Sequence, residues 1–210
     1  MRALVLLVAG VAPVLAVQAP PGSLDARRAL ALCGEADHAA PEAKRDLLER
    51  SLALAETAVK ADDRDPQAHF AVFCALGKQT ELKGLSPGTL GAYRRVRREV
   101  DRALELAPDY VDALTGKGAL LIEAPRLFGG DPGEAERLLR RAIALDPEFV
   151  RPRLDLARAL DAQGRRDAAR GEAAAALALA ERKKDSDDVA AARKLVARLG
   201  GGSATTPGRR

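Results

Sequence analysis

Aromatic residues are scarce in this chain of 210 residues: they make up only 3% of it, and Trp is absent. Buried aromatic rings supply large apolar areas to a core, so a core built mainly from such rings is excluded. Hydrophobic residues nevertheless account for 47% of the chain and charged residues for 30%, a balance typical of globular proteins. The core must therefore consist of Ala and Leu, which favours closely packed helices.

The sequence also lacks features of nucleic-acid binding and of catalysis. The net charge of +4 is modest, and no basic stretch carries the interleaved aromatic residues of a nucleic-acid site. The two histidines, His38 and His69, are far apart, and neither has Cys or carboxylate neighbours at metal-ligand spacing. No nucleophile accompanies a base. We therefore expect no enzyme, no cofactor and no metal, and we assign the histidines surface or packing roles.

The glycine-containing segment 77–80 is not a phosphate-binding loop. It lacks the glycine spacing and the adjacent hydroxyl residue of that motif, so we interpret it as the end of a helix.

Residues 1–19 have the character of a secretory signal peptide. Arg2 provides a positive start, an apolar run follows from Ala3 to Val17, and small residues occur at Ala16 and Ala19. The run is shorter than the roughly 20 apolar residues of a membrane span, and no Cys follows it as a lipid anchor would require. Cleavage is expected after Ala16 or after Ala19, although Pro20 hinders the second site.

Several helices are predicted from their first residues and their apolar faces. Ser23 is expected to cap a helix to about Ala36, and Asp131 to cap another that starts at Pro132, with Glu134 completing a capping-box-like pattern. Pro and Asp residues at helix starts, together with polar turns, predict the others, which are Pro41 to about Ala61, a helix from Pro66, a fourth ending near Leu106, and a last one over 187–199.

The part of the chain that follows Pro108 resembles the tetratricopeptide repeat superfamily. In the unit that begins at Val150, small residues occur at Ala157, Ala169, Ala173 and Ala176, with Gly164 between the two helices. This is the spacing of a helix-turn-helix repeat in which small residues let paired helices pack closely. The resemblance implies an all-α, TPR-like solenoid over residues 20–199, with about four antiparallel helix pairs, a C-terminal capping helix and a disordered tail over residues 200–210.

The preceding unit is longer than the usual repeat of about 34 residues. Its surplus falls within residues 124–130, which we interpret as an enlarged turn containing Arg126, Leu127 and Phe128. Two apolar residues are unusual on a bare turn. We therefore expect Leu127 and Phe128 either to fold back between the helices on each side or to meet a partner, with Arg126 pointing outward as a contact residue.

The repeat resemblance also implies a concave groove lined by the first helix of each pair. Carried over residue by residue, the expected groove positions have mixed charge, which suits a polar peptide or protein partner. These positions are Phe70, Cys74, Asp112, Thr115, Ala119, Glu123, Arg151, Leu154, Asp155 and Arg158. An ordinary solvated helix face remains the alternative.

Cys33 and Cys74 are the only two cysteines. Each lies on the first helix of its pair, and such helices are neighbours in a solenoid. The two residues either form a disulfide in an oxidising compartment or are two small buried apolar residues, and the sequence leaves both open.

More narrowly, residues 42 to 180 resemble the T-component family of TRAP transporters, through the segments DPQAHFAVFCALGK and ALTGKGALLIEAPRLFGGDPGEAERLLRRAIALDP. This resemblance implies a non-catalytic, periplasmic or secreted bacterial scaffold that binds a solute-binding transport subunit. The alternatives are a carrier of a small apolar ligand in the groove and a generic secreted repeat protein. No nucleic acid and no membrane span after signal cleavage are expected.

The signal peptide gives a first testable prediction. The exported protein should begin at Val17 or at Pro20, because the apolar run ends in small residues there. Intact-mass measurement of the exported chain checks this, and a mass that retains Met1 would contradict it.

Overall fold

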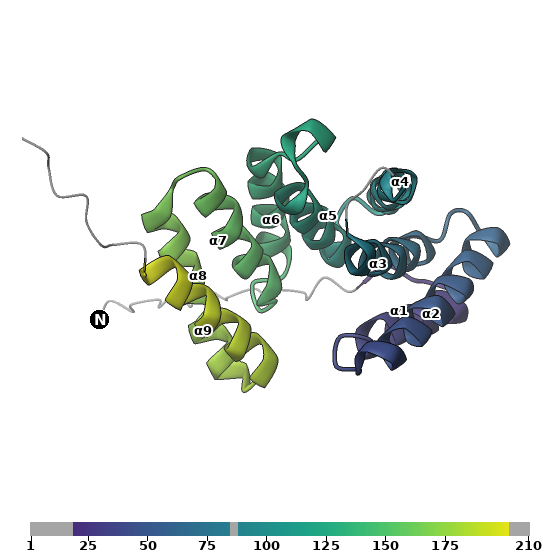
Figure 1. Cartoon of the computed structure of the whole chain (residues 1–210), viewed down its shortest axis with the longest axis horizontal. Helices are drawn as coiled ribbons and strands as arrows, with labels where there is room; N and C mark the ends of the chain where they lie inside the picture. The colour runs from purple at the N-terminus through teal and green to yellow at the C-terminus, as the bar shows by residue number, and fades with distance from the viewer. Residues whose placement is uncertain (1–18, 85–87, 202–210) are drawn as a thin grey trace, which may run out of the picture.

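The computed structural model describes residues 19–84 and 88–201, and within them the only regular structure is helical (Figure 1). Nine α-helices follow one another in the described residues, with one 3-10 turn, η1, over Arg126–Phe128. The helices are α1 (Leu24–Glu35), α2 (Pro41–Ala61), α3 (Pro66–Lys83), α4 (Leu90–Leu106), α5 (Val111–Glu123), α6 (Pro132–Leu145), α7 (Arg151–Ala162), α8 (Arg166–Lys183) and α9 (Ser186–Gly200).

The helices form four antiparallel pairs and a final single helix, arranged as a curved solenoid (Figure 1). Each odd-numbered helix up to α7 packs against the helix that follows it, and α9 packs against α8. The predicted all-α, TPR-like architecture is confirmed. The proposed signal peptide lies almost entirely in residues 1–18, and most of the predicted tail lies in residues 202–210; both ranges are outside the described part. The tail was predicted to start at residue 200, but Gly200 is the last residue of α9.

The two predicted capping residues, Ser23 and Asp131, are confirmed. Like Asp65 and Asp185, they accept hydrogen bonds from backbone N–H groups of the first turn that follows, which satisfies donors that have no partner inside the helix. Glu134 does not complete a capping box, because its carboxylate pairs with Arg137. The backbone N–H of Asp131 donates instead to the Leu121 carbonyl at 3.0 Å.

One predicted helix end is wrong. The segment 77–80 lies inside α3, which continues to Lys83 and ends at Gly84 with φ of 71°. The hydroxyl of Thr80 donates to the Leu76 carbonyl at 2.7 Å, so this polar residue does not interrupt the helix. A left-handed conformation is readily available only to glycine, and Gly84 is therefore a stronger end signal than Gly77.

Alanine provides most of the close helix contacts. Ala135, Ala142, Ala157, Ala169, Ala173 and Ala176 have no solvent exposure. A Cβ atom at Gly118 on α5 would lie 2.7 Å from Leu139 on α6, so this pair also depends on a small residue. Close-packed interiors tolerate little added volume, and the predicted positions of small residues are therefore confirmed as contact points.

His69 has a packing role between α3 and α4. Its Nδ1 lies 2.7 Å from the Glu99 carboxylate and its Nε2 lies 2.9 Å from the Asp63 carbonyl. The hydrogen bond with Glu99 raises the pKa of His69 above 6.5, although burial opposes this. Both ring nitrogens face acceptors, an arrangement that the protonated imidazole satisfies.

The alanine contacts generate a stability prediction. Replacing Ala142 or Ala169 with Leu should overpack a helix pair and lower the free energy of unfolding by roughly 1–3 kcal/mol. Urea unfolding midpoints measure the change. Ala175→Leu is the matched control, because Ala175 is exposed on α8. Equal midpoints for all three variants would show that the assigned contacts do not bear on stability.

Candidate functional site

A groove of about 570 Å³ lies on the concave side of the solenoid, formed by α3, α4, α5, α7 and the segment after α5. Its floor is apolar, with Phe73 from α3, Val96 from α4 and Leu120 from α5. The solenoid curls around this side far enough that the turn after α1 approaches the start of α9, where His38 Nδ1 lies 3.6 Å from the Asp187 carboxylate.

A glycine on α5 makes room for the floor of the groove. A Cβ atom at Gly116 would lie 2.6 Å from the Phe73 ring and 3.3 Å from the Phe70 ring. Such short separations do not occur between real side chains, so any larger residue at this position would displace the rings. Gly116 is thus required by the aromatic rings of α3.

Charged side chains surround the apolar floor. Arg158 on α7 donates to Asp155 at 3.1 Å and to Glu123 on α5 at 2.9 Å, and so links two neighbouring pairs. Asp155 is almost fully buried. Burial raises its pKa, and Arg158 and the nearby Arg151 oppose this rise.

Two more groove carboxylates come from the N-terminal half. Asp37 accepts both of its hydrogen bonds from Lys78 Nζ, each at 2.7 Å. Glu81 is an exposed residue, but partial burial of its carboxyl group in the groove raises its pKa, and the charge of Glu123 adds to the effect. Glu81 forms no ion pair with any residue in the described ranges. The groove therefore offers carboxylates and guanidinium groups around an apolar floor.

Six of the ten groove residues expected from the sequence line this groove, whereas four others pack elsewhere. The six are Cys74, Ala119, Glu123, Arg151, Asp155 and Arg158. Phe70 stacks on Phe73 at 5.5 Å and meets Tyr110 edge-on at 5.0 Å.

The remaining three positions are buried or half-buried between helices. Thr115 donates to the Val111 carbonyl within its own helix, and Leu154 belongs to the C-terminal core cluster. Asp112 is half-buried near Asp146, and burial raises its pKa. The positions transferred from the repeat pattern therefore match the observed groove lining better on α7 than on α5 or α3.

Sequence reasoning missed Phe73, Lys78, Glu81 and Val96, all of which line the groove. On α3, the residues Phe73, Gly77 and Glu81 recur every fourth position and so share one face. That spacing indicates a shared helix face, but the interpretation of residues 77–80 as a helix end excluded Glu81 from the helix. Val96 comes from a second helix, which the repeat pattern does not place on the concave side.

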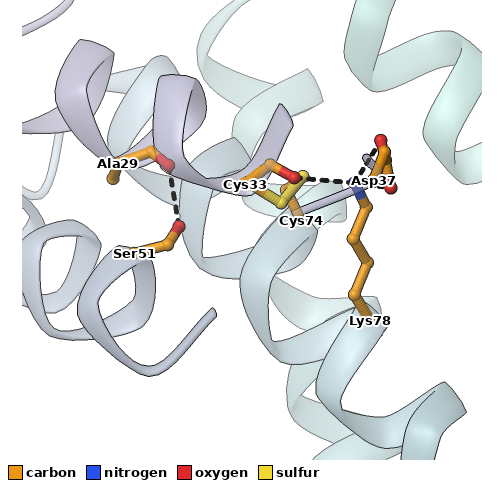
Figure 2. Close-up of a disulfide and its surroundings, with 6 residues drawn as sticks. All are labelled: Ala29, Cys33, Asp37, Ser51, Cys74 and Lys78. Carbon is orange, nitrogen blue, oxygen red and sulfur yellow. Dashed lines mark hydrogen bonds and ion pairs between the residues drawn. A yellow bond between two sulfur atoms is a disulfide. The ribbon is translucent and has the colours of Figure 1, made fainter. Parts of the chain in front are cut away.

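The structure joins Cys33 on α1 and Cys74 on α3 by a disulfide, with their Cα atoms 6.4 Å apart (Figure 2). Lys78 lies beside it, and its Nζ donates to the Cys33 carbonyl at 2.9 Å as well as to Asp37. Farther along α1, the hydroxyl of the buried Ser51 donates to the Ala29 carbonyl at 2.7 Å. Cys74 lines the groove, so the disulfide fixes α1 to the groove wall.

The predicted turn residues are only partly packed. Leu127 is 88% exposed, and Arg126 is also exposed. Phe128 is half-buried, and its carbonyl accepts a hydrogen bond from the Tyr93 hydroxyl of α4 at 3.4 Å. Of the two expected alternatives, folding back between α5 and α6 does not apply to Leu127, because the turn rests on α4 and leaves that side chain in solvent. Contact with a partner stays a prediction.

No group of three or more His, Cys, Asp or Glu side chains in the described part of the chain could hold a metal ion. No helix there is both long enough and apolar enough to span a membrane.

Comparisons with known proteins agree on the repeat architecture. Residues 129–199, which begin directly after η1 and run from α6 into α9, match the family model described as tetratricopeptide repeat. The fold is a TPR-like helical solenoid. No curated protein sequence matches the chain.

Solved structures show the same fold over a longer stretch. A thermophilic TPR protein of Thermus thermophilus is 22% identical, with a TM-score of 0.61 over 80% of this chain and 81% of that one. MamA from Desulfovibrio magneticus RS-1 is 18% identical, with a TM-score of 0.53 over 88% of this chain and 100% of that one. These similarities extend the tetratricopeptide architecture beyond residues 129–199. They bear on the fold alone.

The disulfide generates a prediction for the N-terminal half of the repeat solenoid. Replacing Cys33 and Cys74 together with Ala should lower the free energy of unfolding by about 2–4 kcal/mol, because the unfolded chain loses a cross-link. Urea unfolding measures the change, and the wild-type protein treated with dithiothreitol should match the variant. Two free thiols in the untreated exported protein would contradict the bond.

Proposed function

We propose that this repeat solenoid is a non-catalytic scaffold that binds an extended segment of a partner protein in its concave groove. Tetratricopeptide repeats generally mediate protein–protein interactions, and such solenoids present extended concave surfaces for binding. The observation that carries the proposal is the groove itself, in which an apolar floor is surrounded by charged side chains on three successive first helices.

The charges of the groove define the segment that would fit it. The Glu81 side chain on α3 makes no ion pair within the described residues, and both Glu123 and Lys78 lie near it. Arg151 on α7 is exposed and makes no ion pair or hydrogen bond with another described residue. A peptide with a basic side chain toward Glu81, an acidic one toward Arg151, and an apolar side chain between them over Phe73 is complementary to this arrangement.

We further propose that the protein acts outside the cytoplasm, in the periplasm of a bacterium. The apolar run after Arg2 supports export. The Cys33–Cys74 disulfide supports an oxidising compartment, because cytosolic thiols are normally kept reduced. A role as a T-component-like subunit that binds the solute-binding protein of a TRAP transporter rests on the resemblance of residues 42–180 to that family.

A second candidate function is the transport or storage of a small ligand in the same groove. Its volume of about 570 Å³ falls within the range of about 300–1,000 Å³ that small-molecule sites occupy, and Phe73, Val96 and Leu120 offer apolar contacts. Native mass spectrometry distinguishes the two functions, because a small ligand would appear as a mass added to the purified chain.

The groove proposal predicts the effect of a single substitution. Ala119 is a half-buried residue of the groove wall, and Ala119→Arg should project a long side chain into the groove. The affinity for a partner recovered from periplasmic extract should fall by about tenfold or more, which corresponds to about 1.4 kcal/mol. Urea midpoints should stay unchanged, and Ala175→Arg on the exposed face of α8 is the matched control.

The outcome also tests the identity of the partner. Recovery of a solute-binding transport subunit that the groove variant fails to hold would support the T-component role. Equal binding by wild-type protein, the Ala119 variant and the control would overturn the groove as the docking site.

A further inference from the structure

A second concavity lies on the other side of the turn that carries η1. It has a volume of about 520 Å³ and is formed by the first three turns of α4 on one side and by the turn on the other. We call it the arginine cleft after the residues of α4 that line it, Arg94, Arg97 and Arg98. Ala124 and Pro125 belong to the groove, whereas Leu127 and Phe128 belong to the arginine cleft, so the turn separates the two sites.

The positive charge of the arginine cleft is uncompensated. Arg94, Arg97 and Arg98 are exposed, and across residues 19–84 and 88–201 none of their side chains makes an ion pair or hydrogen bond. Their neighbours on the same helix differ: Arg95 pairs with Glu56 and Glu99, and Arg102 pairs with Glu105. The acidic residue of the cleft, Asp101, is bound by Lys117 of α5 at 2.7 Å.

The opposite wall of the cleft is apolar and is held in place. Leu127 projects into solvent with 88% of its surface exposed, next to the half-buried Phe128. The Tyr93 hydroxyl bonds to the Phe128 carbonyl, and the guanidinium group of Arg97 lies against Gly129, where a Cβ atom would collide with it. Gly129 has φ of 89°, a conformation that also favours glycine. The turn is thus fitted to α4.

We propose that the arginine cleft docks an acidic peptide segment of a partner protein, whose carboxylates are held by Arg94 and Arg98 while an apolar side chain packs on Leu127. Arginine binds carboxylates with two parallel hydrogen bonds, which gives both strength and direction. Arg94 and Arg98 are four residues apart and so lie one above the other on the helix. This site is distinct from the groove and does not depend on the function proposed for it.

Other occupants fit the arginine cleft less well. The chain's own end segments are not complementary in charge, since Arg2 is the only charged residue of 1–18 and segment 202–210 carries two arginines and no acid. A single-stranded nucleic acid needs a series of aromatic faces for successive bases, and the cleft is lined by two aromatic residues, Tyr93 and Phe128, that are both half-buried. A lipid surface is flat, whereas the three arginines line a concavity.

Binding of a defined probe tests the proposal. The probe is a rhodamine-labelled peptide of Asp, Glu and Gly with a central Leu, titrated against the full chain by fluorescence anisotropy. The same peptide with Asn and Gln in place of the acids should bind at least about tenfold more weakly, and higher salt should weaken binding, because the interaction is between exposed charges.

Variants locate the probe on the chain. Arg94→Gln with Arg98→Gln should weaken binding about tenfold or more, whereas Arg45→Gln with Arg198→Gln, an equal change of charge at exposed residues of α2 and α9, should not. Leu127→Ala should weaken binding several-fold, unlike Leu82→Ala on the exposed side of α3. Ala119→Arg should leave probe binding unchanged, which separates this site from the groove.

Several results would overturn the proposal. Equal binding of the acidic and amide peptides, or equal losses in the two double-arginine variants, would show that the cleft does not recognise carboxylates. Tighter binding of a single-stranded DNA oligonucleotide or of phosphatidylglycerol vesicles, lost in the Arg94 and Arg98 variant, would assign the cleft to another class of partner. Self-association on size-exclusion chromatography that the same variant abolishes would identify the occupant as a second copy.

Discussion

Aromatic packing at the joint between α3 and α5 is the constraint on which the binding surfaces depend. Along most of the solenoid, alanines let neighbouring helices approach closely, and α1 packs directly against α3 as α5 does against α7. Between α3 and α5 the rings of Phe70 and Phe73 take the place of such contacts, with Tyr110 edge-on to Phe70 and Gly116 leaving room for both. Rings are larger than alanine side chains, so the joint is wider, and the groove lies along it.

The few aromatic residues are therefore concentrated where the solenoid departs from uniform packing. All of them except Phe149 lie at or beside this joint, since Tyr93 lines both the groove and the arginine cleft and bonds to Phe128. The large aromatic rings thus lie where their size widens the spacing between helices. The turn held by Tyr93 separates a groove whose charges are largely paired from a cleft whose arginines are not, so the two surfaces suit partners of different charge.

The fold was predictable from local signals. Capping residues such as Ser23 and Asp131, and prolines at first helical positions, act within one turn of the chain and are visible in any sequence window. The site was predictable only in part. Arg151, Asp155 and Arg158 were placed on the groove because α7 follows the repeat spacing closely, whereas α3 belongs to a unit that matches the pattern poorly, and its true groove face includes Phe73 and Glu81.

The sequence by itself determined the helices, their pairing and the small residues between them, because propensity, capping and close packing are properties of short segments and of a fixed repeat. Only the tertiary structure decided which of two outcomes Cys33 and Cys74 adopt, because a disulfide depends on the distance between two helices that are far apart in sequence. It likewise decided that Leu127 remains in solvent beside three unpaired arginines, since the direction of that turn depends on its contacts with α4 rather than on its own residues.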